Sequence, residues 1–367
     1  MTSKQKLCVI YNMAAQYRAP IFQLMDNEFD IDWYYGSKID NIKELDDSIL
    51  KNVTKLDRSN FVGPLYWQHG VINLINNEYQ SYIILGDLFS LSTWTLLIKN
   101  RILNKKKKIY LWSHGWYGRE NKLKRWLKKC FFNLADGTFL YGNYAKRIAI
   151  QQGNNPEKLW VIHNSLDHST HVKLREKLPK SNVYHDYFKN IDPTLIFIGR
   201  LTKVKQLDLL IRAVSILKSK GENYNIVFVG DGVERNNLER NAKDHNLNVW
   251  FYGSCYDDTQ TAQLIFDADL CVSPGNVGLT AMHAMSFGTP VLTHSNFPNQ
   301  MPEFEAIIEG ETGAFFLEGS IESLSENISK WFNTHKDREL TREKCYKEID
   351  TNWTPEFQLN KIKTILR

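Results

Sequence analysis

Short, almost uninterrupted apolar runs recur along the chain, and amphipathic stretches of helical period separate them. There are eleven such runs, each four or five residues long: Leu7–Tyr11, Tyr82–Leu85, Ile109–Trp112, Thr138–Tyr141, Leu159–Ile162, Leu195–Ile198, Ile226–Val229, Val249–Tyr252, Leu270–Ser273, Pro290–Thr293 and Ala314–Leu317. Continuous apolar strands with helices between them are typical of parallel sheets covered on both faces. The pattern therefore predicts an α/β protein.

A polar stretch without strong periodicity, about Asp167–Asp192, divides the runs into two series. We therefore predict two α/β domains, residues 1–172 and 193–350, joined by a linker at 173–192. Residues 351–367 are predicted to form a final helix that packs back on the first domain. Thr354, Pro355 and Glu356 supply its cap, its first-turn proline and its first-turn acid.

One helix in the second half is strongly indicated. After Lys205, the apolar residues fall on a single stripe of helical period: Leu207, Leu210, Ile211, Val214 and Leu217.

Composition indicates a cytoplasmic protein. The apolar runs are strand-sized, far below the roughly 20 residues that cross a bilayer, and the first residues lack the zones of a secretion signal. The five cysteines are widely spaced and odd in number, as expected of buried thiols in a reducing compartment.

Charge is unevenly distributed along the chain. Residues 1–172 hold 23 Lys and Arg against 15 Asp and Glu, although the net charge of the whole chain is only +5. This excess predicts an anionic partner for the first half: a membrane surface, a phosphate-bearing acceptor or nucleic acid. No nucleic-acid-reading module is recognisable, so we expect no nucleic-acid partner.

The segment Ser273–Pro290, SPGNVGLTAMHAMSFGTP, contains candidate phosphate-binding chemistry. A strand ends at Ser273, Gly275 and Gly278 leave the backbone room, and a helix begins near Val277. The free N–H groups at such a helix start can bind a phosphate. A tight turn with close helix packing would explain the same glycines.

A second segment, IGRLTKVKQLDLL, places cations at the end of a strand. Gly199 ends the strand, and Arg200 and Lys205 precede the helix that follows. An arginine and a lysine at this edge of a parallel sheet can neutralise a diphosphate. The alternative is two solvated surface cations.

Together these segments resemble the donor-binding half of the retaining glycosyltransferases of family 4. The similarity continues through VFVGDG, FYG, the Ala268–Pro274 segment, MPEFEAI and EGETGAFF, and it spans about Asp192–Phe332. It implies the GT-B fold, two Rossmann-like domains facing each other across a cleft, with the acceptor side in the first domain.

The resemblance also implies roles for individual residues. Arg200 and Lys205 would contact the donor diphosphate, and both are named as catalytic candidates. Backbone groups would bind its phosphate oxygens, and Gly253 would lie against the nucleobase. The full set of donor-binding candidates is Gly199, Gly253, Gly275, Val277, Gly278, Leu279, His283 and Glu303.

The sequence departs from the family at two positions of this helix segment. The family has a glutamate at each end of a Glu, seven residues, Glu motif, and this chain has Gly275 and His283 instead. The contact to the transferred sugar and the contact to the ribose are thereby put in question. A neutral His283 can still hydrogen-bond a hydroxyl, and a packed helix histidine is the alternative.

In the first half, Trp112-Ser113-His114-Gly115 follows a strand directly. It resembles the family's strand-end histidine that faces the transferred sugar, so His114 is the third catalytic candidate. Less specific acceptor-side candidates are Gln16, Tyr17, Arg18, Tyr141 and Asn164.

We predict no metal site. Asp267-Ala268-Asp269 imitates a metal-binding Asp-x-Asp motif, but it leads from a helix into a buried strand. We expect metal-independent chemistry and no permanently bound cofactor, with the nucleotide sugar as a substrate.

A basic amphipathic segment, RENKLKRWLKKCFFNL, surrounds an apolar stripe with lysines and arginines; it contains Trp126 and lies near Trp116. With the lysine run at 105–108, it predicts either peripheral contact with the inner face of the plasma membrane or an ordinary core helix with a solvated basic side.

The expected activity is transfer of a sugar from a UDP- or GDP-sugar to a saccharide or lipid-linked acceptor, with retention, in surface polysaccharide or glycolipid biosynthesis. Because both motif glutamates are missing, the alternative is a catalytically degenerate GT-B protein that acts as a binding or partner subunit.

Overall fold

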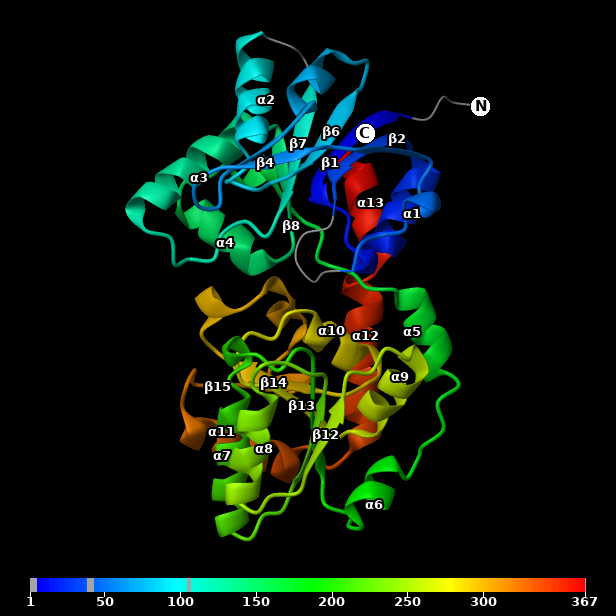
Figure 1. The fold of residues 1–367 in the computed structure, drawn as a ribbon, viewed down its shortest axis with the longest axis vertical. Coiled ribbons are helices and arrows are strands. Elements are labelled where there is room, and N and C mark those ends of the chain that lie inside the picture. Colours follow the sequence, from blue (N-terminus) through cyan, green and yellow to red (C-terminus); the bar gives the residue numbers. More distant parts are fainter. Residues whose placement is uncertain (1–4, 38–42, 104–106, 367) are drawn as a thin grey trace. The chain divides into compact units, whose positions relative to one another are not determined.

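The computed structural model describes residues 5–37, 43–103 and 107–366, and it divides the chain into two units (Figure 1). Unit 1 comprises residues 1–167 together with 354–367, and unit 2 comprises residues 168–353. Two of the four lysines in the basic run 105–108 lie outside the described residues.

Unit 1 is built on a seven-stranded sheet in which all neighbouring strands are parallel, in the order β3-β2-β1-β6-β7-β8-β9. Its strands are β1 Lys6–Met13, β2 Asp30–Gly36, β3 Asn52–Lys55, β6 Ser81–Leu85, β7 Lys108–Ser113, β8 Gly137–Leu140 and β9 Leu159–Val161. A small antiparallel pair consists of β4 Arg58–Asn60 and β5 Tyr66–Gln68. The strand order reverses between β1 and β6, which is the topological switch point of this sheet.

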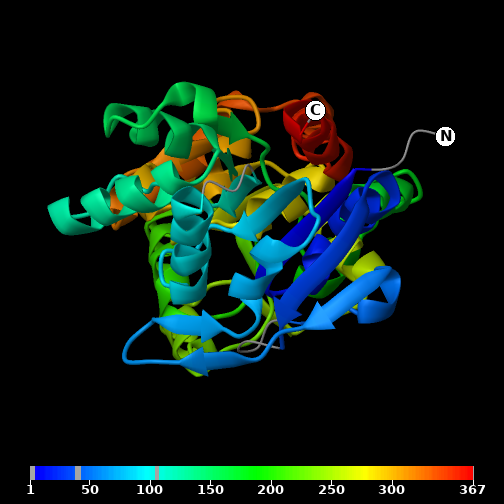
Figure 2. The ribbon, with the colours of Figure 1, turned by 90° about the horizontal axis from the view of Figure 1, so that it is seen from above.

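Helices cover both faces of the sheet of unit 1 (Figure 2). One face packs against α1 Ala19–Glu28 and α13 Pro355–Leu366. The other packs against α2 Leu91–Ile102, α3 Lys122–Leu134, α4 Asn143–Gln151 and the 3₁₀ segment η3 Val71–Asn76. Further 3₁₀ turns are η1 Gln16–Arg18, η2 Asp47–Ile49 and η4 Pro156–Lys158.

Unit 2 repeats this design with six parallel strands in the order β12-β11-β10-β13-β14-β15. They are β10 Thr194–Ile198, β11 Asn225–Val229, β12 Val249–Gly253, β13 Leu270–Ser273, β14 Val291–His294 and β15 Gly313–Phe316. The order reverses between β10 and β13, which is the topological switch point of this sheet, the place where open α/β sheets commonly bind ligands.

Eight α-helices and three 3₁₀ turns complete the described part of unit 2. The helices are α5 His168–Arg175, α6 Val183–Phe188, α7 Leu207–Ser219, α8 Arg235–Asp244, α9 Asp258–Asp267, α10 Leu279–Ser286, α11 Ile321–Thr334 and α12 Arg338–Asn352. The turns are η5 Lys203–Lys205, η6 Phe297–Asn299 and η7 Pro302–Ala306. The five residues of the expected stripe are all buried in the core between α7, α8, α11 and the sheet.

The units differ in their limits from the domains expected from sequence. Residue 172 lies inside α5, which belongs to unit 2, and the expected linker 173–192 contains α6. Residues 354–367 are part of unit 1, where α13 packs against α1 and contributes Ile362 to the core. The Thr354 side chain caps this helix by accepting the Phe357 N–H at 3.0 Å.

All eleven expected strands are present, and four further strands were missed. In β2, buried Trp33 and Tyr35 alternate with Asp32 and Tyr34, so this strand lacks the continuous apolar run that identified the others. The Trp33 indole N–H finds its acceptor in the Asp26 carboxylate at 2.8 Å, which lets this large polar-tipped side chain lie in the core.

Candidate functional site

The candidate donor-binding residues gather at the carboxyl ends of β10 and β13, which flank the switch point of unit 2. Gly199 follows β10, and the Thr280 hydroxyl in the first turn of α10 donates to the Ile198 carbonyl at 3.0 Å. This hydrogen bond holds the start of α10 next to the end of β10. The first N–H groups of α10 have no acceptor within the helix, so Gly278 and Leu279 present donors at this edge.

Lys205 is fixed next to this helix start. Its ammonium donates to the Asn276 carbonyl at 2.7 Å and to the Asn276 side-chain oxygen at 2.8 Å. Burial lowers the pKa of Lys205, the Glu303 carboxylate opposes that shift, and the charge of Arg200 adds to it. Arg200, Lys205 and Glu303 therefore interact electrostatically, with Arg200 exposed and Glu303 only 2% exposed.

Gly275 is required by a close approach of the backbone. A Cβ at this position would lie 2.1 Å from the Val204 carbonyl oxygen, and the Gly275 N–H donates to the Lys205 carbonyl at 2.9 Å. The Lys203–Lys205 turn thus occupies the space that a side chain at position 275 would need. Gly275 positions Lys205 and offers no group of its own beyond the backbone.

Val277 differs from the sequence-based expectation. Its N–H donates to the Gln300 side-chain oxygen at 2.9 Å, so this group is already used within the chain. The Gln300 amide donates in turn to the Thr293 hydroxyl and the His294 carbonyl, each at 2.9 Å. Gln300, which is 2% exposed, therefore braces the loop before α10 against β14.

Two other expected donor-site residues lie further along the same unit. Gly253 ends β12 at the same edge of the sheet, with φ +92°, and its carbonyl accepts the Gly230 N–H at 2.8 Å. His283 is one turn into α10 and packs against His171 of α5, with ring centroids 5.4 Å apart. Burial lowers the pKa of His283, so a neutral ring is favoured there.

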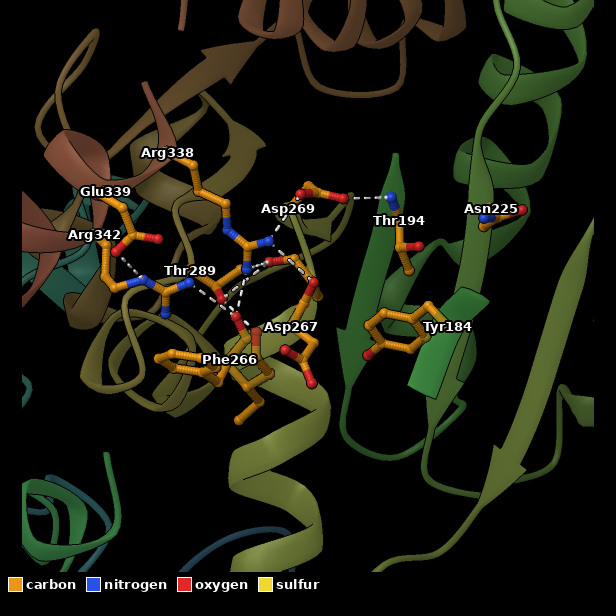
Figure 3. A network of polar contacts seen from close by, with 12 residues as sticks. Tyr184, Thr194, Asn225, Phe266, Asp267, Asp269, Thr289, Arg338, Glu339 and Arg342 are labelled. Atoms are coloured by element: carbon orange, nitrogen blue, oxygen red, sulfur yellow. Dashed lines mark hydrogen bonds and ion pairs between the residues drawn. The ribbon is translucent and has the colours of Figure 1, made fainter. Parts of the chain in front are cut away.

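The Asp-x-Asp segment has a structural explanation. Asp267 accepts hydrogen bonds from Ser181 and Gln263. Asp269 accepts the Thr194 N–H at 2.8 Å and pairs with Arg338 at 3.0 Å (Figure 3). The described residues contain no group of three or more His, Cys, Asp or Glu side chains arranged to hold a metal.

His114 lines a cavity of about 360 Å³ that lies wholly within unit 1. The cavity lies beside the switch point and is formed by residues at or just after the carboxyl ends of β1, β6, β7 and β8, together with residues of α3. Its lining residues are Arg18, Leu85, Gly86, Asp87, Leu88, Phe89, Ser113, His114, Gly115, Tyr117, Arg119, Glu120, Lys124, Lys128, Phe132 and Tyr141. Of the less specific acceptor-side candidates, Arg18 and Tyr141 reach this cavity, whereas Asn164 is buried outside it and accepts the Ser165 N–H.

The His114 ring is held between two tyrosines and close to two cations. Nδ1 lies 2.9 Å from the Tyr117 hydroxyl, and the ring meets Tyr141 edge-on with centroids 5.0 Å apart. Burial, followed by the charges of Arg18 and Lys128, lowers the pKa of His114 to about 4. The imidazole is therefore neutral near pH 7 and can donate or accept one hydrogen bond at each nitrogen according to its tautomer.

Sequence reasoning missed a buried ion pair in the wall of this cavity. Lys128 and Glu120, each 7% exposed, lie 2.6 Å apart, and Glu120 also accepts the N–H groups of Tyr117 and Gly118 at 2.9 Å. Burial lowers the pKa of Lys128. Burial alone would raise the pKa of Glu120, but the hydrogen bonds from Lys128 and the Tyr117 N–H have the larger combined effect, so the pKa of Glu120 is lowered. Lys128 was visible only as one of several lysines on a basic helix.

Comparison with known proteins identifies the fold. Residues 187–348, which include most of unit 2, match the family model described as glycosyl transferases group 1. A solved structure of Anabaena HepE in complex with UDP superimposes over 99% of both chains with a TM-score of 0.70, at 15% identity. The chain has the GT-B fold.

Two curated relatives match parts of the chain. An uncharacterised 41.2 kDa protein in the cps region of Klebsiella pneumoniae is 25% identical over 223 residues, 58% of each chain. A GDP-mannose-dependent phosphatidylinositol dimannoside mannosyltransferase of Mycobacterium tuberculosis is 31% identical over 123 residues, which is 33% of this chain and 30% of that protein. The match spans little more than half of the first relative and less than a third of the second.

Proposed function

We propose that this GT-B protein is a glycosyltransferase of the family 4 type. It moves a sugar from a nucleoside diphosphate donor to a saccharide or lipid-linked acceptor in surface polysaccharide or glycolipid biosynthesis. The observation that carries this proposal is the edge of unit 2 at which the start of α10, Lys205 and Arg200 come together. A helix start and two cations form a site for a diphosphate, whose charge grows as it leaves.

The chemistry that we propose proceeds with retention. The bond between the anomeric carbon and the diphosphate breaks, and the acceptor oxygen bonds to that carbon on the same face. The acceptor proton passes to an oxygen of the leaving phosphate. Arg200, Lys205 and the N–H groups of Gly278 and Leu279 in unit 2 stabilise the departing charge. We propose separately that His114 of unit 1, which is neutral near pH 7, hydrogen-bonds a sugar hydroxyl. The donor remains a substrate, and we propose that no metal is needed.

The decisive experiment is a thermal-shift panel of UDP, GDP, CMP, ADP and their common sugar conjugates, followed by turnover of the selected donor. A ligand that binds only the native state raises the melting temperature. At a ligand concentration of 100 times its Kd, the free energy of unfolding increases by about 2.7 kcal/mol. We expect one base to be selected and its sugar conjugate to be consumed. Selective binding without turnover would favour the catalytically degenerate partner subunit, and the absence of any shift would contradict the donor site.

A second proposal concerns the surface of α3. Leu123 and Trp126 are 66% and 61% exposed on this helix. Its exposed cations surround them: Lys122, Lys124, Arg125 and Lys129. Exposed apolar side chains flanked by lysine and arginine fit an anionic lipid surface. No helix among the described residues is long and apolar enough to cross a membrane. We propose peripheral contact with the inner face of the plasma membrane.

We expect the protein to float with vesicles that contain anionic lipid and to stay behind with neutral ones. A Leu123→Ser, Trp126→Ala double variant should lower binding to anionic vesicles about tenfold, because both apolar anchors are removed. Phe61→Ala is the matched control, since Phe61 is 53% exposed elsewhere on unit 1. Equal flotation of the double variant and the wild type at low salt would contradict membrane contact through α3.

A further inference from the structure

Arg18 is a buried cation that lacks an acidic partner. Its side chain is 7% exposed, and no Asp or Glu in residues 5–37, 43–103 or 107–366 forms an ion pair with it. Its guanidinium donates a hydrogen bond to the Tyr141 hydroxyl. Four aromatic rings surround the guanidinium carbon at 5.3 to 5.5 Å: Tyr11, Tyr17, Trp112 and Tyr141.

Burying the Arg18 guanidinium without an acidic partner lowers the stability of the folded protein. A guanidinium has five N–H donors, and charges taken out of water are normally paired with an opposite charge. Aromatic faces return only part of the lost hydration. The Tyr11 hydroxyl, 2% exposed, and the Trp112 indole N–H are also buried without a hydrogen-bond partner among the described residues. Two polar groups of this aromatic cage, the Tyr11 hydroxyl and the Trp112 indole N–H, therefore have no hydrogen-bond partner among the described residues.

The cavity next to Arg18 is cationic. Arg18, Arg119, Lys124 and Lys128 line it, against only Asp87 and Glu120. The two acids are engaged locally, because Asp87 accepts the Phe89 N–H at 3.0 Å and Glu120 accepts from Lys128 and two backbone N–H groups. The excess positive charge is also felt by His114, whose pKa Arg18 and Lys128 help to lower.

We propose that this cavity binds an oxyanion of the acceptor, a phosphate ester or a sugar carboxylate, with the guanidinium of Arg18 as its principal ligand. A planar guanidinium matches the two oxygens of either group. A volume of about 360 Å³ lies within the range of small-molecule sites and accommodates a monosaccharide that carries the anion. The acceptor role rests on the proposed glycosyltransferase function, whereas anion binding itself does not.

The test uses the full chain and a local readout, so that the phosphate site of unit 2 does not contribute. Inorganic phosphate, glucose 6-phosphate, glucuronate and glucose are titrated while the imidazole resonance of His114, assigned with His114→Gln, is followed by NMR against pH. An anion bound beside Arg18 and Lys128 should raise the pKa of His114 from about 4. Glucose should leave it unchanged.

Arg18→Met is the informative variant. Methionine is unbranched and apolar like the aliphatic stem of arginine, so the variant removes the charge and should weaken anion binding at least tenfold. Its melting temperature should equal or exceed that of the wild type, because an unpaired buried charge is removed. Arg18→Lys should fold and retain weaker binding. Arg147→Met, at an exposed arginine on α4 that does not line the cavity, should bind as the wild type does.

Each outcome either supports or contradicts the proposed anion site. Preference for glucose 6-phosphate over glucuronate assigns a phosphate ester, the reverse assigns a uronate, and either supports the proposal. Anion binding that persists in Arg18→Met would overturn it. The proposal would also be overturned if the pKa of His114 in the wild type changed with none of the three anions at concentrations on the order of 10 mM. That failure would leave nucleotide binding by unit 2 intact, so it is distinguishable from failure of the proposed function.

Discussion

Replacing Lys205 with methionine should abolish the nucleotide-induced thermal shift and lower kcat/KM by about 100-fold or more. The reason is geometric as well as electrostatic. The ammonium is fixed by two hydrogen bonds to Asn276, beside the start of α10, so it meets a diphosphate without reorganisation. Loss of one preorganised charge at a leaving group costs roughly 3 kcal/mol, which corresponds to such a factor.

The matched control is Lys203→Met, two residues earlier in the same 3₁₀ turn. Lys203 is exposed and has no described contact with the start of α10, so its removal should change donor affinity little. Because the pKa of Lys205 is lowered, donor affinity should also fall at alkaline pH before an ordinary lysine would lose its proton. Equal thermal shifts in the wild type and Lys205→Met would contradict the assigned role.

Replacing Arg338 with alanine should destabilise unit 2 by about 2–4 kcal/mol. The guanidinium reaches from α12 to the end of α9 (Figure 3). There it donates to the carbonyls of Phe266, Asp267 and Ala268 and pairs with Asp269 at 3.0 Å. Removing it takes one donor from each of these groups, although the Phe266 carbonyl keeps a hydrogen bond from Arg342 and the Asp269 carboxylate keeps the Thr194 N–H.

For a unit of this size the expected loss in Tm is roughly 5–15 °C, to be measured by calorimetry or circular dichroism. Arg212→Ala, at an exposed position on α7, should change the free energy of unfolding by less than about 0.5 kcal/mol. Arg338→Lys should be intermediate, because one ammonium cannot serve four acceptors. If Arg338→Ala lowered the free energy of unfolding as little as the control does, the contacts of Arg338 with α9 and Asp269 would contribute little to stability.

The sequence predicted those features that are encoded locally. The eleven strands, the buried stripe of α7 and the capped start of α13 each depend on neighbouring residues, and the structure contains all of them. By contrast, β2 was missed because its buried aromatics alternate with polar residues. The units also end at other residues than expected, because α5 and α6 pack on α9 instead of forming an unstructured linker.

The site was only partly predictable for the same physical reason. The cations and glycines after β10 and β13 are visible as motifs, but the use of the Val277 N–H by Gln300 joins residues that are 23 positions apart. Arg18 and Tyr141 are separated by 123 positions, and their contact depends on the order of strands in the sheet. No local sequence pattern predicts contacts between residues so far apart in the chain.

The position of α13 also has a consequence for biosynthesis. Ile362 and Leu366 lie in the same buried cluster as Leu7 and Val9, yet the ribosome makes them only after all of unit 2. Unit 1 must therefore wait with this part of its core uncovered while residues 168–353 are translated and begin to fold. A nascent chain that stalls before residue 354 would display that surface, and it is there that we expect chaperones to act on this protein.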